Sequence, residues 1–150
     1  MKIFSVDNNC FVTLEYKGDP TGYSGFHVEI HADIRHGKFD ARNIDVQFLN
    51  LEEFVSELDK FILDRSCTPR LEGTYNTYFV FSATGNAVIL KYQLGDVFCG
   101  RKTSYFYQSG EFEIEQESLL KYLGDFRAME AQQGEPPRLS WRPFGLSAGR

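Results

Sequence analysis

Two histidines and a glutamate occupy every second position in one stretch of the sequence, at His27, Glu29 and His31. In a β-strand, alternate side chains project from the same face, so these three would lie in a row. Imidazole and carboxylate groups are suitable ligands for zinc or iron. The row advances about 6–7 Å per step, however, which is too linear for three ligands to converge on one ion without help from a neighbouring strand. We therefore interpret it as the solvated face of a strand and predict no metal or other cofactor.

The three cysteines, Cys10, Cys67 and Cys99, are far apart in the sequence and form no C-x-x-C pair. This spacing argues against a zinc cluster and a disulfide framework, and it is typical of reduced thiols in a cytosol. The sequence has no G-x-S-x-G motif, and its glycines do not form a phosphate loop. We therefore predict a cytoplasmic protein that is not an enzyme, and we assign no catalytic residue.

Glutamates also occupy every second position from Glu111 to Glu115. In a strand they share one face, opposite Phe112 and Ile114, and so lie in water, whereas general acid–base catalysis needs a buried carboxyl with a raised pKa. They are either a solvated edge that discourages aggregation or an acidic surface for a protein partner. Our candidate partner-binding residues are six carboxylates in two segments, Glu52, Glu53, Glu57, Glu111, Glu113 and Glu115.

Apolar residues recur at helical spacing along 51–62 and form one stripe. Its members are Leu51, Phe54, Val55, Leu58, Phe61 and Ile62. Asn50 is a suitable N-cap, and Glu53, at the third helical position, can complete a capping box. An amphipathic helix cannot bury such a stripe alone. We therefore predict a helix over 51–64 that packs on a sheet.

The segments on either side of this helix have the alternation and turn chemistry of strands. We predict strands within 10–16, 26–35, 43–48, 71–83 and 87–94, a strand-like stretch over 104–107, a turn or bulge at 109–110 and a last strand over 111–115. A second helix is predicted over 117–130. The fold class is then α+β, with one antiparallel meander sheet of about six strands and both helices on one face.

A shift of 68 residues places the second strand–helix unit on the first without a gap. It aligns Ile44 with Phe112, and it aligns Leu51 and Leu58 with Leu119 and Phe126. Either the chain contains a two-fold pseudo-repeat, or two strand–helix units with similar loops match by coincidence. Both interpretations stay open at this point.

The chain has 150 residues and a net charge of −5. Its length predicts one α+β domain over 1–132, followed by an irregular tail over 133–150 that contains several prolines and glycines. The charge argues against nucleic-acid binding, which needs clustered basic residues. Polar residues interrupt the uncharged run 73–90, so we predict no membrane segment, and the N-terminus does not predict a signal peptide.

Strands lead into the helix sequence 50–58, the stretch 69–73 begins a second set of strands, and Phe112-Glu113-Ile114 leads into the helix sequence 119–123. Over about residues 10–130, this order and apolar spacing resemble the small bacterial immunity proteins of the WapI type and related uncharacterised bacterial domains. The resemblance implies a cytosolic, often acidic protein that binds a cognate toxin domain and does not catalyse a reaction. It assigns no binding motif residue by residue.

Two classes of function follow. The first is a non-catalytic protein-binding protein, most concretely an immunity protein whose partner is a basic toxin domain, with the acidic residues speeding encounter. The alternative is a small-molecule or carbohydrate-binding module that stacks its ligand on exposed tyrosines, Tyr75, Tyr78, Tyr105 and Tyr107. The oligomeric state is open in both cases.

Overall fold

The computed structural model describes residues 1–18 and 24–134. The first half of the chain forms β1 (Lys2–Phe4), β2 (Cys10–Gly18), β3 (Ser24–Ile34), β4 (Gly37–Val46) and α1 (Leu51–Asp64). The second half forms β5 (Arg70–Glu72), the 3₁₀ turn η1 (Thr74–Asn76), β6 (Tyr78–Thr84), β7 (Ala87–Cys99), β8 (Thr103–Ile114), η2 (Gln116–Ser118) and α2 (Leu119–Gly134). The predicted tail begins within the last turn of α2, and its remainder, 135–150, lies outside the described residues.

The described strands form two antiparallel four-stranded sheets, in the orders β1-β2-β3-β4 and β5-β6-β7-β8. The α+β class and the meander order are therefore confirmed, whereas the prediction of a single sheet of about six strands is wrong. Part of the error lies in the predicted strand 71–83. Tyr75 and Asn76 have φ of 60° and 56°, which is left-handed backbone that a strand does not adopt, so this segment divides into β5, η1 and β6.

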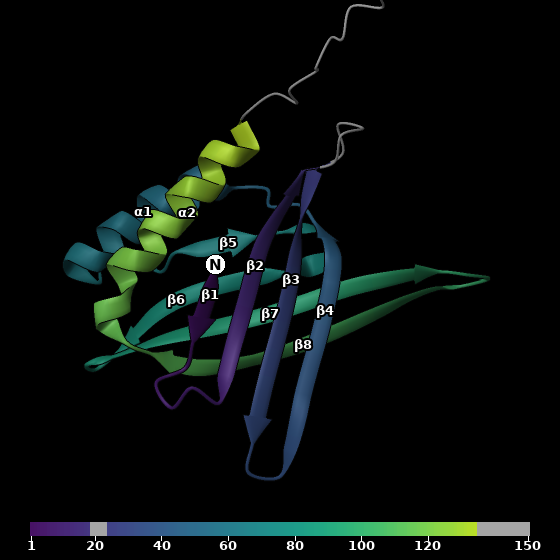
Figure 1. The fold of residues 1–150 in the computed structure, drawn as a ribbon, viewed down its shortest axis with the longest axis horizontal. Helices are drawn as coiled ribbons and strands as arrows, with labels where there is room; N and C mark the ends of the chain where they lie inside the picture. The colour runs from purple at the N-terminus through teal and green to yellow at the C-terminus, as the bar shows by residue number, and fades with distance from the viewer. Residues whose placement is uncertain (19–23, 135–150) are drawn as a thin grey trace, which may run out of the picture.

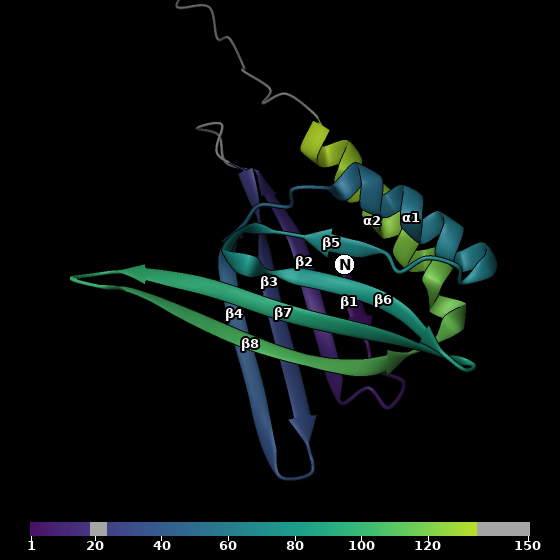
Figure 2. The same ribbon diagram turned by 180° about the vertical axis from the view of Figure 1, so that it is seen from behind.

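The two sheets face each other and cross at a large angle, and the helices lie side by side along one side of them (Figures 1 and 2). Each helix contacts a strand from the other half of the chain. The Phe54 ring of α1 lies 5.9 Å from the Phe81 ring of β6, and the Tyr122 hydroxyl of α2 accepts a hydrogen bond from the Phe4 N–H of β1. The two halves therefore interlock and share one core.

Three phenylalanines from three elements meet at the centre of that core. Phe126 of α2 lies edge-on to Phe54 and Phe81, with ring centroids 4.8 and 6.3 Å away, and all three side chains are fully buried. Such tilted and edge-to-face contacts are favourable for aromatic pairs. The predicted helix over 51–64 is confirmed at both ends, and its apolar stripe is buried except for Ile62, which is half-buried.

The order of four strands followed by a helix occurs twice, and the shift of 68 residues holds beyond the strand–helix units. It maps the first residue of β1 onto the first residue of β5. It also maps the last residue of β4 onto the last residue of β8, and the first residue of α1 onto the first residue of α2. One backbone hydrogen bond of each half corresponds to within one residue, because Leu14 N–H donates to Met1 O and Phe81 N–H donates to Pro69 O, so the acceptors differ by 68 positions and the donors by 67. These correspondences favour a structural pseudo-repeat over a coincidental match.

The predicted capping box does not form. Asn50 precedes α1, but its side chain makes no capping hydrogen bond. Its amide instead donates to Arg70 O and accepts from Glu72 N–H, at 2.8 Å in each case. Because β5 is only three residues long, these bonds fix it beside the start of α1.

Candidate functional site

The distal part of the β7–β8 hairpin, which we call the arm (residues 96–107), projects far beyond the rest of the molecule (Figures 1 and 2). β7 and β8 have 13 and 12 residues, whereas β6 has seven and pairs with β7 only as far as Gln93. The arm is therefore a two-stranded ribbon, and among the described strands none of its own sheet lies beside it.

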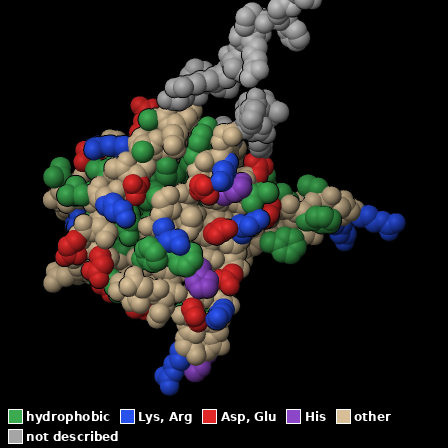
Figure 3. All heavy atoms as spheres, in the orientation of Figure 1, with side chains coloured by type: hydrophobic (Ala, Val, Ile, Leu, Met, Phe, Trp, Pro, Cys, Tyr) green, Lys and Arg blue, Asp and Glu red, His purple; other side chains and the backbone are tan. Residues whose placement is uncertain are grey.

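Four aromatic side chains of the arm are exposed to solvent. The exposed fractions are 65% for Phe98, 64% for Tyr105, 61% for Phe106 and 49% for Tyr107. Strand alternation places Phe98 and Phe106 on the face that continues the core side of the sheet, and it places the two tyrosines on the opposite face. Figure 3 shows hydrophobic side chains along the arm and Lys and Arg side chains at its end. Soluble monomers rarely expose so many apolar groups together without a binding role.

The base of the arm is anchored to both sheets through Gly95. Its carbonyl accepts a hydrogen bond from the buried amide of Asn43 on β4 at 2.8 Å, and its N–H donates to Thr77 Oγ1 at 3.1 Å. A Cβ at this position would lie 1.8 Å from the Tyr75 carbonyl oxygen, so only glycine allows η1 to approach β7. The arm is therefore held at a defined point where it leaves the body.

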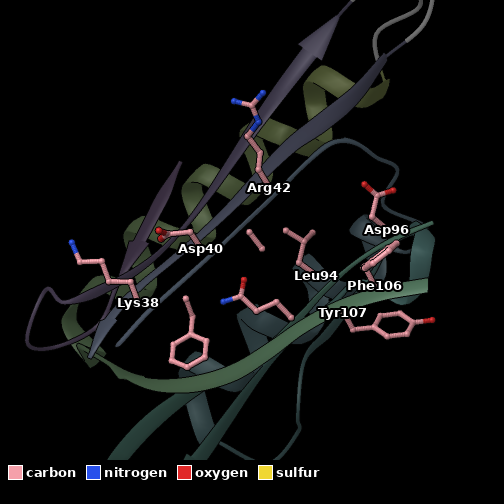
Figure 4. Close-up of a pocket in the computed structure, with 11 residues that line it drawn as sticks. Lys38, Asp40, Arg42, Leu94, Asp96, Phe106 and Tyr107 are labelled. Carbon is pink, nitrogen blue, oxygen red and sulfur yellow. The ribbon is translucent and has the colours of Figure 1, made fainter. Parts of the chain in front are cut away.

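A cleft of about 490 Å³ lies between β4 and this base. The β4 segment 38–42 lines one side, and Leu94, Asp96, Phe106 and neighbouring residues line the other (Figure 4). The side-chain oxygen Oε1 of Gln108, also in the lining, is buried without a hydrogen-bond partner among the described residues. A buried unpaired acceptor costs roughly 1–3 kcal/mol, so a donor from a bound partner would find a favourable position here.

The predicted strand with His27, Glu29 and His31 is β3, and the side chains of Val28 and Ile30 between them are buried. Two side chains of the row interact with different residues of the neighbouring strand β4. His31 Nδ1 contacts the Asp40 carboxylate, and Glu29 lies 3.7 Å from the Arg42 guanidinium, both on β4. Within residues 1–18 and 24–134, no group of three or more His, Cys, Asp or Glu side chains is placed to hold a metal ion.

The six candidate carboxylates are all exposed, but the structure does not bring them into one surface. Glu111 and Glu113 lie on β8, whereas the three on α1 lie beside β5, at the opposite edge of the same sheet. Basic groups also interrupt the β8 set. Lys91 lies directly opposite Glu111, and Glu115 shares a small cleft with Lys2 and Lys121.

The four tyrosines of the alternative prediction do not form one open platform. Tyr75 and Tyr78 are half-buried, and the Arg70 guanidinium lies 4.3 Å from the Tyr78 ring centre. Burial, followed by the nearby Asp45 carboxylate that accepts a bond from the Tyr75 hydroxyl, raises the pKa of Tyr75. Only Tyr105 and Tyr107, both of the arm, are exposed.

Our sequence reasoning did not identify the arm. It predicted strands over 87–94 and 104–107 and a turn or bulge at 109–110, whereas β7 extends to Cys99 and β8 runs without a break from Thr103 to Ile114. A signal was present in the sequence: Val97-Phe98 and Tyr105-Phe106-Tyr107 are apolar at consecutive positions. In a hairpin, consecutive apolar residues make both faces apolar, which a half-buried strand does not show.

No family model matches the chain, and neither a curated protein nor a solved structure matches it. The likeness to immunity proteins therefore stays a prediction from the sequence. Over the described part of the chain, no helix has the length and apolar character needed to cross a bilayer.

Proposed function

We propose that this protein is a non-catalytic binding protein that docks on another protein through its arm, most concretely an immunity protein that covers a toxin domain. The observation that carries the proposal is the set of four exposed aromatic side chains on a projecting, anchored hairpin. Aromatic residues are enriched at the centres of protein interfaces, where they supply contact area at a small cost in side-chain entropy.

The geometry of the arm suits a protein partner better than a small ligand. Its aromatic groups lie along a ribbon and on both of its faces, whereas ligand pockets enclose most of a small molecule. The adjoining cleft extends the surface with the charged β4 segment 38–42. An interface with an aromatic centre and a polar rim has this composition.

The charges and the arm act at different stages of binding, the charges during encounter and the arm in the bound complex. The net charge of −5 and the exposed carboxylates would attract a basic toxin domain over a distance of about a Debye length, roughly 8 Å at physiological salt. The arm then provides the contact area that slows dissociation. Salt should therefore lower the association rate, whereas arm substitutions should raise the dissociation rate.

Affinity capture with three baits tests the proposal. The baits are the wild-type chain, the double variant Phe98→Ser/Phe106→Ser, and the control Leu63→Ser, which removes an apolar side chain that is 81% exposed at the end of α1. We expect wild type and control to capture the same protein in stoichiometric amount from lysate of the source cells, and the arm variant to lose it.

The captured protein then distinguishes the immunity function from other protein binding. Its expression alone in a bacterial host should arrest growth, and co-expression with the wild-type chain, but not with the arm variant, should restore growth. Capture that is equal for all three baits would contradict the proposal. Binding to a glycan that Tyr105→Ala/Tyr107→Ala abolishes, with no protein captured, would favour the carbohydrate-binding alternative.

A further inference from the structure

The outer edge of β8 has no neighbouring strand along most of its length. In the described part of the chain β8 pairs only with β7. Near its C-terminal end, the Glu113 carbonyl accepts a hydrogen bond from Val6 N–H at 3.0 Å, and at the other end the arm turns at 100–102. The segment Thr103–Glu111 therefore presents unpaired backbone groups to solvent.

The bond at Glu113 also shows which residues direct their backbone groups toward this edge. In an antiparallel ladder, the N–H and C=O of alternate residues point to the same side. Because the Glu113 carbonyl points outward, those of Thr103, Tyr105, Tyr107 and Ser109 point outward too. Natural proteins usually protect such an edge with charged side chains, proline, a bulge or a cover, and this segment contains no proline and a single charged residue, Glu111, at its end. Tyr107 is its midpoint.

The charges of the hairpin are self-complementary about this midpoint. Arg101 and Glu113 lie six residues from Tyr107, on opposite sides of it. If two copies of β8 pair antiparallel over 103–111 about a two-fold axis at Tyr107, the turn that carries Arg101 of each copy lies at the end of the paired segment, beside Glu113 of the other. Neither residue forms a salt bridge with another residue that the structure describes. Opposite charges that meet at the ends of two paired strands favour their association.

We propose that the chain forms a two-fold symmetric dimer in which the β8 edges pair antiparallel in this register. The two second sheets become one continuous eight-stranded sheet, and no β8 edge is left open over 103–111. A contact of this kind is closed, because the same edge serves both copies. The proposal goes beyond the binding function, since it uses the edge of the arm and leaves both of its faces exposed.

A charge-swap experiment tests the pairing. We expect sedimentation equilibrium to show a concentration-dependent dimer for the wild-type chain, with a dissociation constant raised at least tenfold by Arg101→Glu and by Glu113→Arg. The combined variant should return to within about threefold of wild type. Lys60→Glu, an exposed charge change on α1, should have no effect. A wild-type chain that stays monomeric at 100 µM, or single variants that dimerise like wild type, would overturn the proposal.

Cross-linking tests the register independently. In a Cys99→Ser background, Tyr107→Cys places two thiols across the two-fold axis and should give a disulfide-linked dimer under mild oxidation. Tyr105→Cys, which would lie opposite Ser109, should not. Equal cross-linking of the two variants, or none by either, would exclude this register. Because both experiments measure self-association, they can fail while arm-dependent capture of a toxin succeeds, and the reverse also holds.

Discussion

The β7–β8 hairpin contains two regions that share a backbone ladder and differ in what covers their side chains. Within the body, Val88, Leu90, Tyr92 and Leu94 are buried in alternation, because the first sheet and the helices lie over that face. In the arm the same ladder continues, but Phe98 and its aromatic neighbours are exposed. Backbone pairing therefore sets where a strand runs, whereas a second layer decides whether its apolar side chains contribute to folding.

The largest effect should come from the body. Phe54→Ala removes a fully buried ring that contacts the rings of Phe81 and Phe126, so the free energy of unfolding should fall by about 3–5 kcal/mol. Urea denaturation measures this loss. Leu63→Ala, on the exposed side of the same helix, should change stability by less than about 0.5 kcal/mol. Equal losses for the two variants would show that the aromatic cluster is not the core.

The joint between body and arm should show the next effect. Gly95→Ala forces a Cβ against the Tyr75 carbonyl, and the shift of η1 or β7 should cost about 3 kcal/mol of unfolding free energy. Gly124→Ala is the matched control, because a Cβ at that helical position would have no atom within 4 Å apart from its chain neighbours and the backbone of its own helix. It should stabilise the protein by about 0.5–1 kcal/mol. The changes in the free energy of unfolding of the two variants, measured by thermal and urea unfolding, should therefore have opposite signs.

A smaller loss should follow removal of the polar link at the same joint. Asn43→Ala leaves the Gly95 carbonyl without its buried donor and also removes the acceptor for Asp45 N–H, so we expect a loss of about 2 kcal/mol. Hydrogen exchange should show faster exchange at residues 94–96. An unchanged unfolding free energy would mean that water replaces the side chain and that the anchor is weak.

The smallest effect on stability should come from the arm itself. Phe98→Ser/Phe106→Ser removes two side chains that are mostly exposed, so the free energy of unfolding should change by less than about 0.5 kcal/mol. The midpoint of urea unfolding should match that of wild type while partner capture is lost. A loss comparable to that of Phe54→Ala would show that the arm packs against the body and is not a free binding element.

The sequence predicted the helices and strands better than it predicted which of them pair and pack together. Helical spacing predicts α1 because all apolar residues of the stripe lie on the same face of a helix. The alternation of apolar and polar residues predicts β3. Neither pattern says which sheet a strand joins, so the division into two sheets was not foreseen. Left-handed backbone at Tyr75, and the use of Asn50 to hold β5 instead of capping α1, depend on contacts with distant residues.

The candidate site was harder to predict for the same reason. Periodicity correctly placed Glu111 and Glu113 on a solvent face, but it could not show that α1 lies at the other edge of their sheet. The arm is a candidate site because no element that the structure describes covers its aromatic side chains, and the lack of a covering layer is a property of the tertiary structure. Consecutive apolar residues in a hairpin are the one local signal of such a region.

Hydrogen–deuterium exchange of the chain alone and in complex with its captured partner tests the central claim most directly, because it compares the arm with the acidic residues in one measurement. We expect binding to slow exchange in the arm (96–107) and along the β4 side of the cleft (38–42), with no change at the start of α1, where Glu52, Glu53 and Glu57 lie. Slower exchange at the start of α1 with an unchanged arm would contradict the account.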